Sequence, residues 1–95
     1  MSQHWDIFLT MTMAREQSRA ARGWLGWSQR ELATRAGVAL NTVYEFETGR
    51  RTTTAANIAT MRRAIEAVGI RLLFDDTGAP AGIVRQDIKD LSTLR

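Results

Sequence analysis

The sequence predicts a small, mainly α-helical domain of about four helices that ends in a β-hairpin. Apolar residues recur at three- and four-residue spacing through most of residues 13–68, which is the pattern of amphipathic helices. Glycines stand where these stretches end, and the spacing changes to strict alternation from Ile70 onward. A chain of 95 residues is long enough for one compact domain with a modest core and too short for two.

The first two helices are indicated by their apolar faces and by their ends. Between Met13 and Gly26 small or apolar residues share one helical face: Ala14, Ser18, Ala21 and Leu25. Ser28 is a good N-cap and Glu31 follows at the capping-box spacing, so a second helix is expected over residues 29–36. Gly37 ends that helix, because glycine adopts the left-handed backbone conformation without a Cβ clash.

The third and fourth helices follow the same logic. The third is expected over residues 38–47, closed by Gly49, with three apolar side chains facing inward: Val38, Val43 and Phe46. Threonines 52–54 offer caps for the fourth, which Gly69 stops. Its inward stripe comprises Ile58, Met61, Ala64, Ile65 and Val68. Its expected outer face carries Arg62, Arg63 and Glu66.

The remaining segments alternate or carry short apolar repeats. Ile70, Leu72 and Phe74 alternate with Arg71, Leu73 and Asp75, and residues 77–82 form a turn before residues 83–85, which predicts a hairpin. Residues 1–11 also alternate and allow a third strand. In residues 87–95 the apolar positions stand three apart, as in one amphipathic turn or a frayed tail: Ile88, Leu91 and Leu94.

The charge is uneven along the chain. The net charge is +3, and residues 1–71 carry ten arginines against six acidic residues. The excess of positive charge in residues 1–71 is compatible with a polyanionic partner, but charge alone is weak evidence for one. No apolar run approaches 18 residues and no cysteine is present, so we expect no membrane span and a cytoplasmic location.

The most informative segment is residues 29–48, which read QRELATRAGVALNTVYEFET. Ala33 is small where two helices must cross, and Gly37 supplies a tight turn between them. The apolar positions suit a shared small core: Leu32, Ala36, Val38, Val43 and Phe46. Here the chain resembles the phage Cro/repressor-type, Xre-like helix-turn-helix family, through the phrases GWSQRELATRAGV, NTVYEFETGRR and RRAIEAVGI. The hairpin segment FDDTGAPAGIVR is similar to the β extension of small bacterial members, which have a glycine-richer turn.

The resemblance implies a lambda-repressor-like helical bundle, with the helix-turn-helix proper at residues 29–48. It divides the chain into an N-terminal segment (1–11), a DNA-binding domain (12–69), the hairpin (70–86) and a tail (87–95). It also implies a sequence-specific transcriptional regulator, a repressor or autoregulator that binds double-stranded DNA as a homodimer on an inverted repeat. No cofactor is implied.

Individual roles follow from the same resemblance. Residues matching the base-contacting positions of the recognition helix are Leu40, Asn41 and Glu45. Residues matching backbone-contacting positions are Ser28, Gln29, Thr42, Tyr44, Arg50 and Arg51. Asparagine can pair bidentately with adenine, glutamate can accept from cytosine N4, and leucine can touch a thymine methyl group. Arg22 and Glu47 match a buried ion pair that joins the first helix to the end of the recognition helix.

The chain departs from the family pattern at two points. No lysine or arginine lies between Val38 and Gly49, so the commonest specific contact, arginine to guanine, is missing from the recognition helix. Ala39 replaces the usual capping serine or threonine, which should cost about 1 kcal/mol in helix stability. DNA affinity must therefore come from the flanks.

Other interpretations stay open. The same fold could serve as an interaction module, such as an antitoxin or an antagonist of another regulator, and an ordinary helical hairpin is the plainest alternative. The surface that pairs two copies is open between the hairpin, the N-terminal strand and the apolar positions of the tail. Metal binding at His4 or at Asp75 and Asp76 is not expected, and no set of residues suits catalysis.

Overall fold

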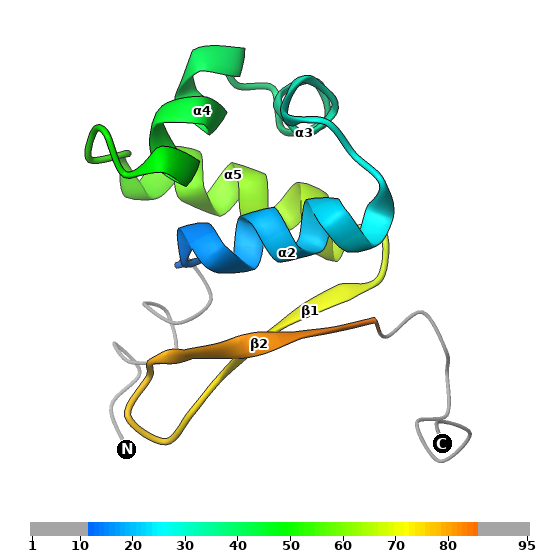
Figure 1. Ribbon diagram of the computed structural model, residues 1–95, viewed down its shortest axis with the longest axis vertical. Coiled ribbons are helices and arrows are strands. Elements are labelled where there is room, and N and C mark those ends of the chain that lie inside the picture. The colour runs from blue at the N-terminus through cyan, green and yellow to red at the C-terminus, as the bar shows by residue number, and fades with distance from the viewer. Residues whose placement is uncertain (1–11, 86–95) are drawn as a thin grey trace.

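A computed structural model places four helices in a layer over a two-stranded hairpin within residues 12–85, the part of the chain that it describes (Figure 1). The elements are α2 (Arg15–Leu25), α3 (Gln29–Ala36), α4 (Leu40–Thr48), α5 (Ala55–Glu66), β1 (Ile70–Phe74) and β2 (Pro80–Arg85). The predicted mainly helical bundle with a hairpin is confirmed. The strand allowed over residues 1–11, His4 and the tail over residues 87–95 lie outside the described residues.

Three predicted helix boundaries differ from the structure, each for a local reason. α2 begins at Arg15 because Ala14 is extended and acts as the N-cap. α4 begins at Leu40, later than predicted, because Ala39 is extended as well, and no side chain caps the helix there. α5 ends at Glu66, short of Val68, and the chain then turns into β1.

The turn between α3 and α4 forms as its residues predict. Gly37 has a φ of 73°, and its N–H donates to the carbonyl of Ala33. At the other end of α3, Ser28 Oγ accepts from the Glu31 N–H at 3.0 Å. The Glu31 carboxylate accepts from Arg35 at 2.8 Å. Of the two hydrogen bonds of the predicted capping box, the structure therefore shows the one to Ser28 Oγ.

The core lies where α3, α4 and α5 meet above the inner face of the hairpin. Five of its apolar residues are completely buried, one of them from α2: Ala21, Leu32, Val43, Met61 and Ile65. The alternating residues Ile70 and Leu72 of β1 close it from below, at 2% and 4% exposure. The apolar residues that follow the helical period and those that follow the strand period therefore pack into one core.

Arg62 corrects the predicted outer face of α5. It was expected outside with Arg63, but it is buried at 8% exposure. Its guanidinium donates to Glu66 and to the carbonyl of Thr12, and it lies 5.4 Å from the Phe74 ring centroid. A long arginine stem can pack in an apolar layer when its charged end finds such partners. Arg62 thereby joins α5 to the segment before α2.

A buried glutamine ties the hairpin to α2. The strands pair antiparallel with Leu72 opposite Ile83, and the register shifts between Leu73 and Phe74. Gln17, 3% exposed, donates from Nε2 to the carbonyls of Leu73 and Gly82 at 2.9 and 3.1 Å. Its Oε1 accepts from the Ala14 N–H, which opens α2. One amide thus satisfies backbone groups of three segments.

The buried carboxylate of Glu47 connects α2, α3 and α4. It accepts from Ser18 Oγ, from Gln29 Nε2 at 3.1 Å, and from Arg22 Nη2 at 2.6 Å and Nε at 2.9 Å. Arg22 also donates to the carbonyl of Trp27 in the turn after α2. The ion pair is therefore part of a network that holds α4 against two other helices.

Two opposing effects act on the pKa of Glu47. Burial raises the pKa of the carboxyl, but hydrogen bonds from Arg22, Ser18 and Gln29, together with the charge of Arg22, hold it below its ordinary value. The carboxylate therefore stays charged in the folded protein. Because its folded pKa is depressed, it stabilises the fold above the unfolded pKa, and this contribution is lost as the pH falls.

Replacing Gln17 should weaken the attachment of the hairpin. Gln17→Leu removes the side-chain partner of one N–H and two carbonyls, and we expect a loss of about 2–3 kcal/mol in urea unfolding. The matched variant Glu16→Leu, one position away and exposed, should change the stability by less than about 0.5 kcal/mol. Equal midpoints for wild type and Gln17→Leu would contradict the anchoring role.

Arg22→Ala should cost about 3 kcal/mol of unfolding free energy, because it leaves the Glu47 charge buried without its cation. Arg63→Ala is the charge-matched control, since Arg63 is an exposed arginine on α5. The two variants are compared by denaturant unfolding at neutral pH. Unchanged stability of Arg22→Ala would show that the pair contributes nothing to folding.

The depressed pKa of Glu47 predicts a pH dependence. The difference in unfolding free energy between wild type and Glu47→Gln should be largest near pH 7 and should shrink as the pH falls below about 4.5, the ordinary value for this carboxyl. Urea unfolding of both proteins across this range measures it. A difference that stays constant with pH would rule out the depressed pKa.

Candidate nucleic-acid interface

The outer face of α4 presents the three side chains predicted to read bases, together with Tyr44, which was predicted to contact the DNA backbone. Leu40, Asn41, Tyr44 and Glu45 fall on one face at helical spacing, while Val43 and Glu47 point into the protein. Leu40 and Tyr44 are 37% and 39% exposed, which is high for large apolar side chains. The structure therefore brings the three candidate readers together on an accessible surface.

Two of these candidate readers are joined to each other. Asn41 Nδ2 donates to Glu45 Oε2 at 3.2 Å across one helical turn. Arg51 Nε lies 3.9 Å from the same oxygen, so a cation from the loop after α4 offsets the charge of Glu45. The arrangement restrains the Glu45 carboxylate and reduces the repulsion that it would exert on a polyanion.

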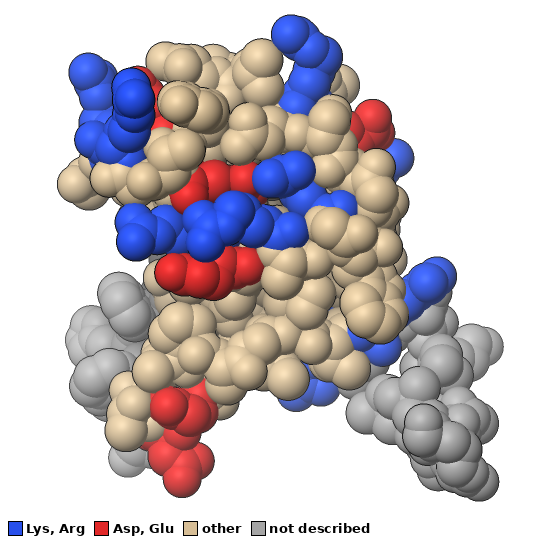
Figure 2. All heavy atoms as spheres, viewed as in Figure 1, with Lys and Arg blue, Asp and Glu red and all other residues tan. Residues whose placement is uncertain are grey.

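The other candidates in this region surround α4. The Arg50 guanidinium lies 5.8 Å from the centroid of the Tyr44 ring, within the range of a cation–π contact. Thr42 is half-buried, and its N–H donates to the carbonyl of Ala39. Figure 2 shows basic side chains gathered over the C-terminal end of α4 and the N-terminal half of α2. Positive charge thus flanks α4 rather than lying on it.

At the start of α3 the two candidate backbone contacts are already engaged within the protein. Ser28 Oγ accepts from Glu31 as the helix cap, and Gln29 Nε2 donates to Glu47 Oε1 at 3.1 Å. The hydrogen bond orients Gln29 beside α4. Gln29 therefore links the α3 N-terminus to the same carboxylate that Arg22 holds.

The structure adds two arginines that the sequence did not single out. Arg19 donates to the backbone carbonyl of Glu47 near the end of α4. The guanidinium of Arg15 packs on Gly49 so closely that a Cβ at that position would collide with it, and Gly49 has a φ of 74°. The positive φ favours glycine at this position, whereas the Arg15 guanidinium is the end of a flexible side chain and could move aside. No local pattern reveals these contacts, since about 30 residues separate their partners.

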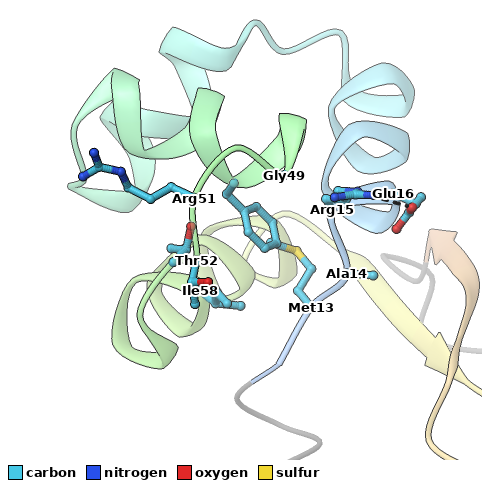
Figure 3. Close-up of a pocket in the computed structure, with 10 residues that line it drawn as sticks. Met13, Ala14, Arg15, Glu16, Gly49, Arg51, Thr52 and Ile58 are labelled. Carbon is cyan, nitrogen blue, oxygen red and sulfur yellow. Dashed lines mark ion pairs between the residues drawn. The ribbon is translucent and has the colours of Figure 1, made fainter.

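A pocket of about 480 Å³ opens between the start of α2, the end of α4 and the start of α5. In Figure 3, Arg15 and Arg51 stand on opposite sides of it, and the Arg51 guanidinium points away from the other labelled residues. Met13, Phe46 and Ile58 give it an apolar floor. The charged groups therefore lie at its rim, facing the surroundings of α4.

The described residues contain no group of three or more acidic or histidine side chains placed to hold a metal ion. Asp75 is used in the hairpin turn, where it accepts from Thr77 and from the Ala79 N–H. These hydrogen bonds hold the pKa of Asp75 below its ordinary value. Within residues 12–85 no helix combines the length and apolar character needed to cross a bilayer.

Comparison with known proteins identifies the family. A family model described as helix-turn-helix matches residues 19–73, more than half of the chain. A search of curated proteins finds no match. The matched residues include α3, the turn at Gly37 and α4, which form the geometry described above. The chain belongs to the Cro/repressor-type, Xre-like helix-turn-helix family of DNA-binding transcription regulators.

Proposed function

We propose that this protein is a sequence-specific repressor or autoregulator that acts in the cytoplasm as a homodimer on an inverted-repeat operator. The observation that carries the proposal is the exposed face of α4, on which Asn41 and Glu45 are hydrogen-bonded to each other and flanked by Arg50 and Arg51. In this proposal residues 12–69 form the DNA-binding domain, and the hairpin at residues 70–86 supports it.

The proposed base contacts use three side chains of α4. Asn41 keeps one N–H and its carbonyl oxygen for an adenine after its bond to Glu45. Asn41 and Arg51 both contact Oε2 of Glu45, which leaves Oε1 for a cytosine amino group. Leu40, exposed at the N-terminal end of the face, suits a thymine methyl group. We therefore expect an operator half-site in which an adenine and a cytosine stand close together.

The proposed backbone contacts surround this face and supply the affinity. Arg50 and Arg51 neutralise phosphates after α4, with Tyr44 and Thr42 beside them. At the α3 N-terminus, Ser28 and Gln29 donate to a phosphate where the helix dipole is positive, through the Ser28 hydroxyl hydrogen and the second Nε2 hydrogen of Gln29, which their bonds to Glu31 and Glu47 do not use. Arg15, at the rim of the neighbouring pocket, is added to this set from the structure.

A homodimer follows from the small size of the reading surface. One recognition helix contacts only a few base pairs. A two-fold dimer makes the same base contacts at a second half-site and so doubles the length of DNA that is read. Half-site centres should then lie about 34 Å apart, which is one turn of B-DNA, or a multiple of that distance.

The second candidate is an antitoxin or an antagonist that binds another protein through the same fold. Trp24 is the surface that such a partner would use, because the residue is 62% exposed on α2. An exposed tryptophan is typical of protein interfaces. Both activities can coexist in one chain, so DNA binding must be tested directly.

Two α4 substitutions test the proposal. Asn41→Ala should lose specific binding by about 1–3 kcal/mol while binding to random DNA is kept. Arg50→Ala should weaken all sequences alike and make the salt dependence shallower by about one phosphate contact. Arg63→Ala, the exposed arginine on α5, is the charge-matched control. Site selection from random duplexes followed by titration at several salt concentrations provides the measurement.

The possible results separate the two candidates. A selected motif that Asn41→Ala relaxes at one position supports direct base reading. If selection enriches no motif and both α4 variants behave as wild type, the DNA-reading proposal fails and the protein-binding candidate takes its place.

A further inference from the structure

Trp24 differs from the other described tryptophan in having no place in the core. Trp27 packs against the core, and the Arg35 guanidinium lies over its ring, 4.3 Å from the centroid of the indole. Trp24 is 62% exposed, on α2. A single exposed apolar side chain is ordinary on a protein surface, but a tryptophan that stands beside an apolar pocket is typical of an interface.

Beside Trp24 the same face of α2 borders an apolar pocket. The pocket has a volume of about 390 Å³, near the lower end of the range for small ligand sites, and lies between α2 and β2. Its walls are formed by Glu16, Gln17, Ala20, Pro80, Gly82 and Ile83. Trp24 follows Ala20 by one helical turn, so the protruding ring and the pocket are neighbours on one surface.

A projection and a hollow side by side on one face form a self-complementary surface. Under a two-fold axis, each residue that contacts a second residue of the partner is matched by the reverse contact. We propose that a second copy of this chain covers the α2–β2 face, with Trp24 of each copy seated in the pocket of the other. This inference rests on the proposed function for the need of a two-fold dimer.

The charges along this face favour the same arrangement. α2 and β2 run in the same direction, side by side (Figure 1). Glu16 lies in the first turn of α2, with its side chain 63% exposed and its carboxylate 3.6 Å from Arg15 Nε. Arg85 is the exposed last residue of β2 and already has a contact within its own chain, so a contact between Glu16 and Arg85 of two copies would add to these contacts. In an antiparallel pairing, Glu16 of one copy approaches Arg85 of the other. Such surface pairs add little affinity but favour one orientation over the reverse.

The size of the contact predicts a weak dimer. Two buried indoles at about 150–250 Å² each, with an equal area of pocket wall, bury roughly 600–1,000 Å² in total. Stable interfaces start at about 1,200 Å². We therefore expect dissociation in the micromolar range for the free protein and stronger pairing when two half-sites hold the copies together.

Sedimentation velocity of the full chain over a range of concentrations tests the inference. Trp24→Ala removes the projection, and Ala20→Arg obstructs the pocket while leaving Trp24 in place. Each should weaken dimerisation by about 100-fold, because a two-fold interface loses the contact twice. Leu73→Ala is the matched control, since Leu73 is an exposed apolar residue on the hairpin outside this pocket. Circular dichroism verifies that each variant is folded.

Binding to one half-site and to the inverted repeat separates this inference from the proposed function. Trp24→Ala should bind one half-site as wild type does and lose the extra affinity for the repeat. If the protein forms dimers that Trp24→Ala and Ala20→Arg weaken, but site selection enriches no DNA motif, the inference is supported and the proposed function is wrong. Specific DNA binding with unchanged assembly in both variants overturns the inference, as does a monomeric wild type on the inverted repeat. If residues 86–95 or a foreign protein cover this face instead, neither Trp24→Ala nor Ala20→Arg should change dimerisation, and the inference is again overturned.

Discussion

The buried carboxylate of Glu47 is the interaction on which the rest of the structure depends. It lies near the end of α4 and is held by Ser18 and Arg22 of α2 and by Gln29 of α3. A buried charge without partners would be costly, so the three helices must meet in one arrangement for the carboxylate to be satisfied. The position of the outer face of α4 is a consequence of that requirement.

In this arrangement, the side chains suited to contact bases lie on α4, whereas the cations that would attract DNA phosphates lie around it. The exposed face of α4 carries no cation, and its one acidic group is offset by Arg51 from the next loop. Arg15 and Arg19 reach the end of α4 from another helix. Positive charge is therefore supplied by the surroundings, while α4 presents an amide, a carboxylate and apolar side chains that can distinguish base edges.

Gln17 has a corresponding role on the opposite side of α2. By satisfying two hairpin carbonyls and the first N–H of α2, it fixes the distance between α2 and β2. That spacing creates the pocket beside Trp24. Two polar side chains, Gln17 and Glu47, thus attach α2 to the hairpin and to the recognition helix, and each determines one functional surface of the proposed regulator.

The candidate readers on α4 were named by the family resemblance. The sequence alone determined the order of the elements, the turn at Gly37 and the inward stripes. These features depend on residues within about four positions of each other, and caps, glycines and apolar periods report them directly. Only the tertiary structure decided that Arg62 is buried, that Gln17 anchors the hairpin and that Arg15 packs on Gly49. Their partners lie tens of residues away, and the energy of a polar side chain depends on what the packed chain places opposite it.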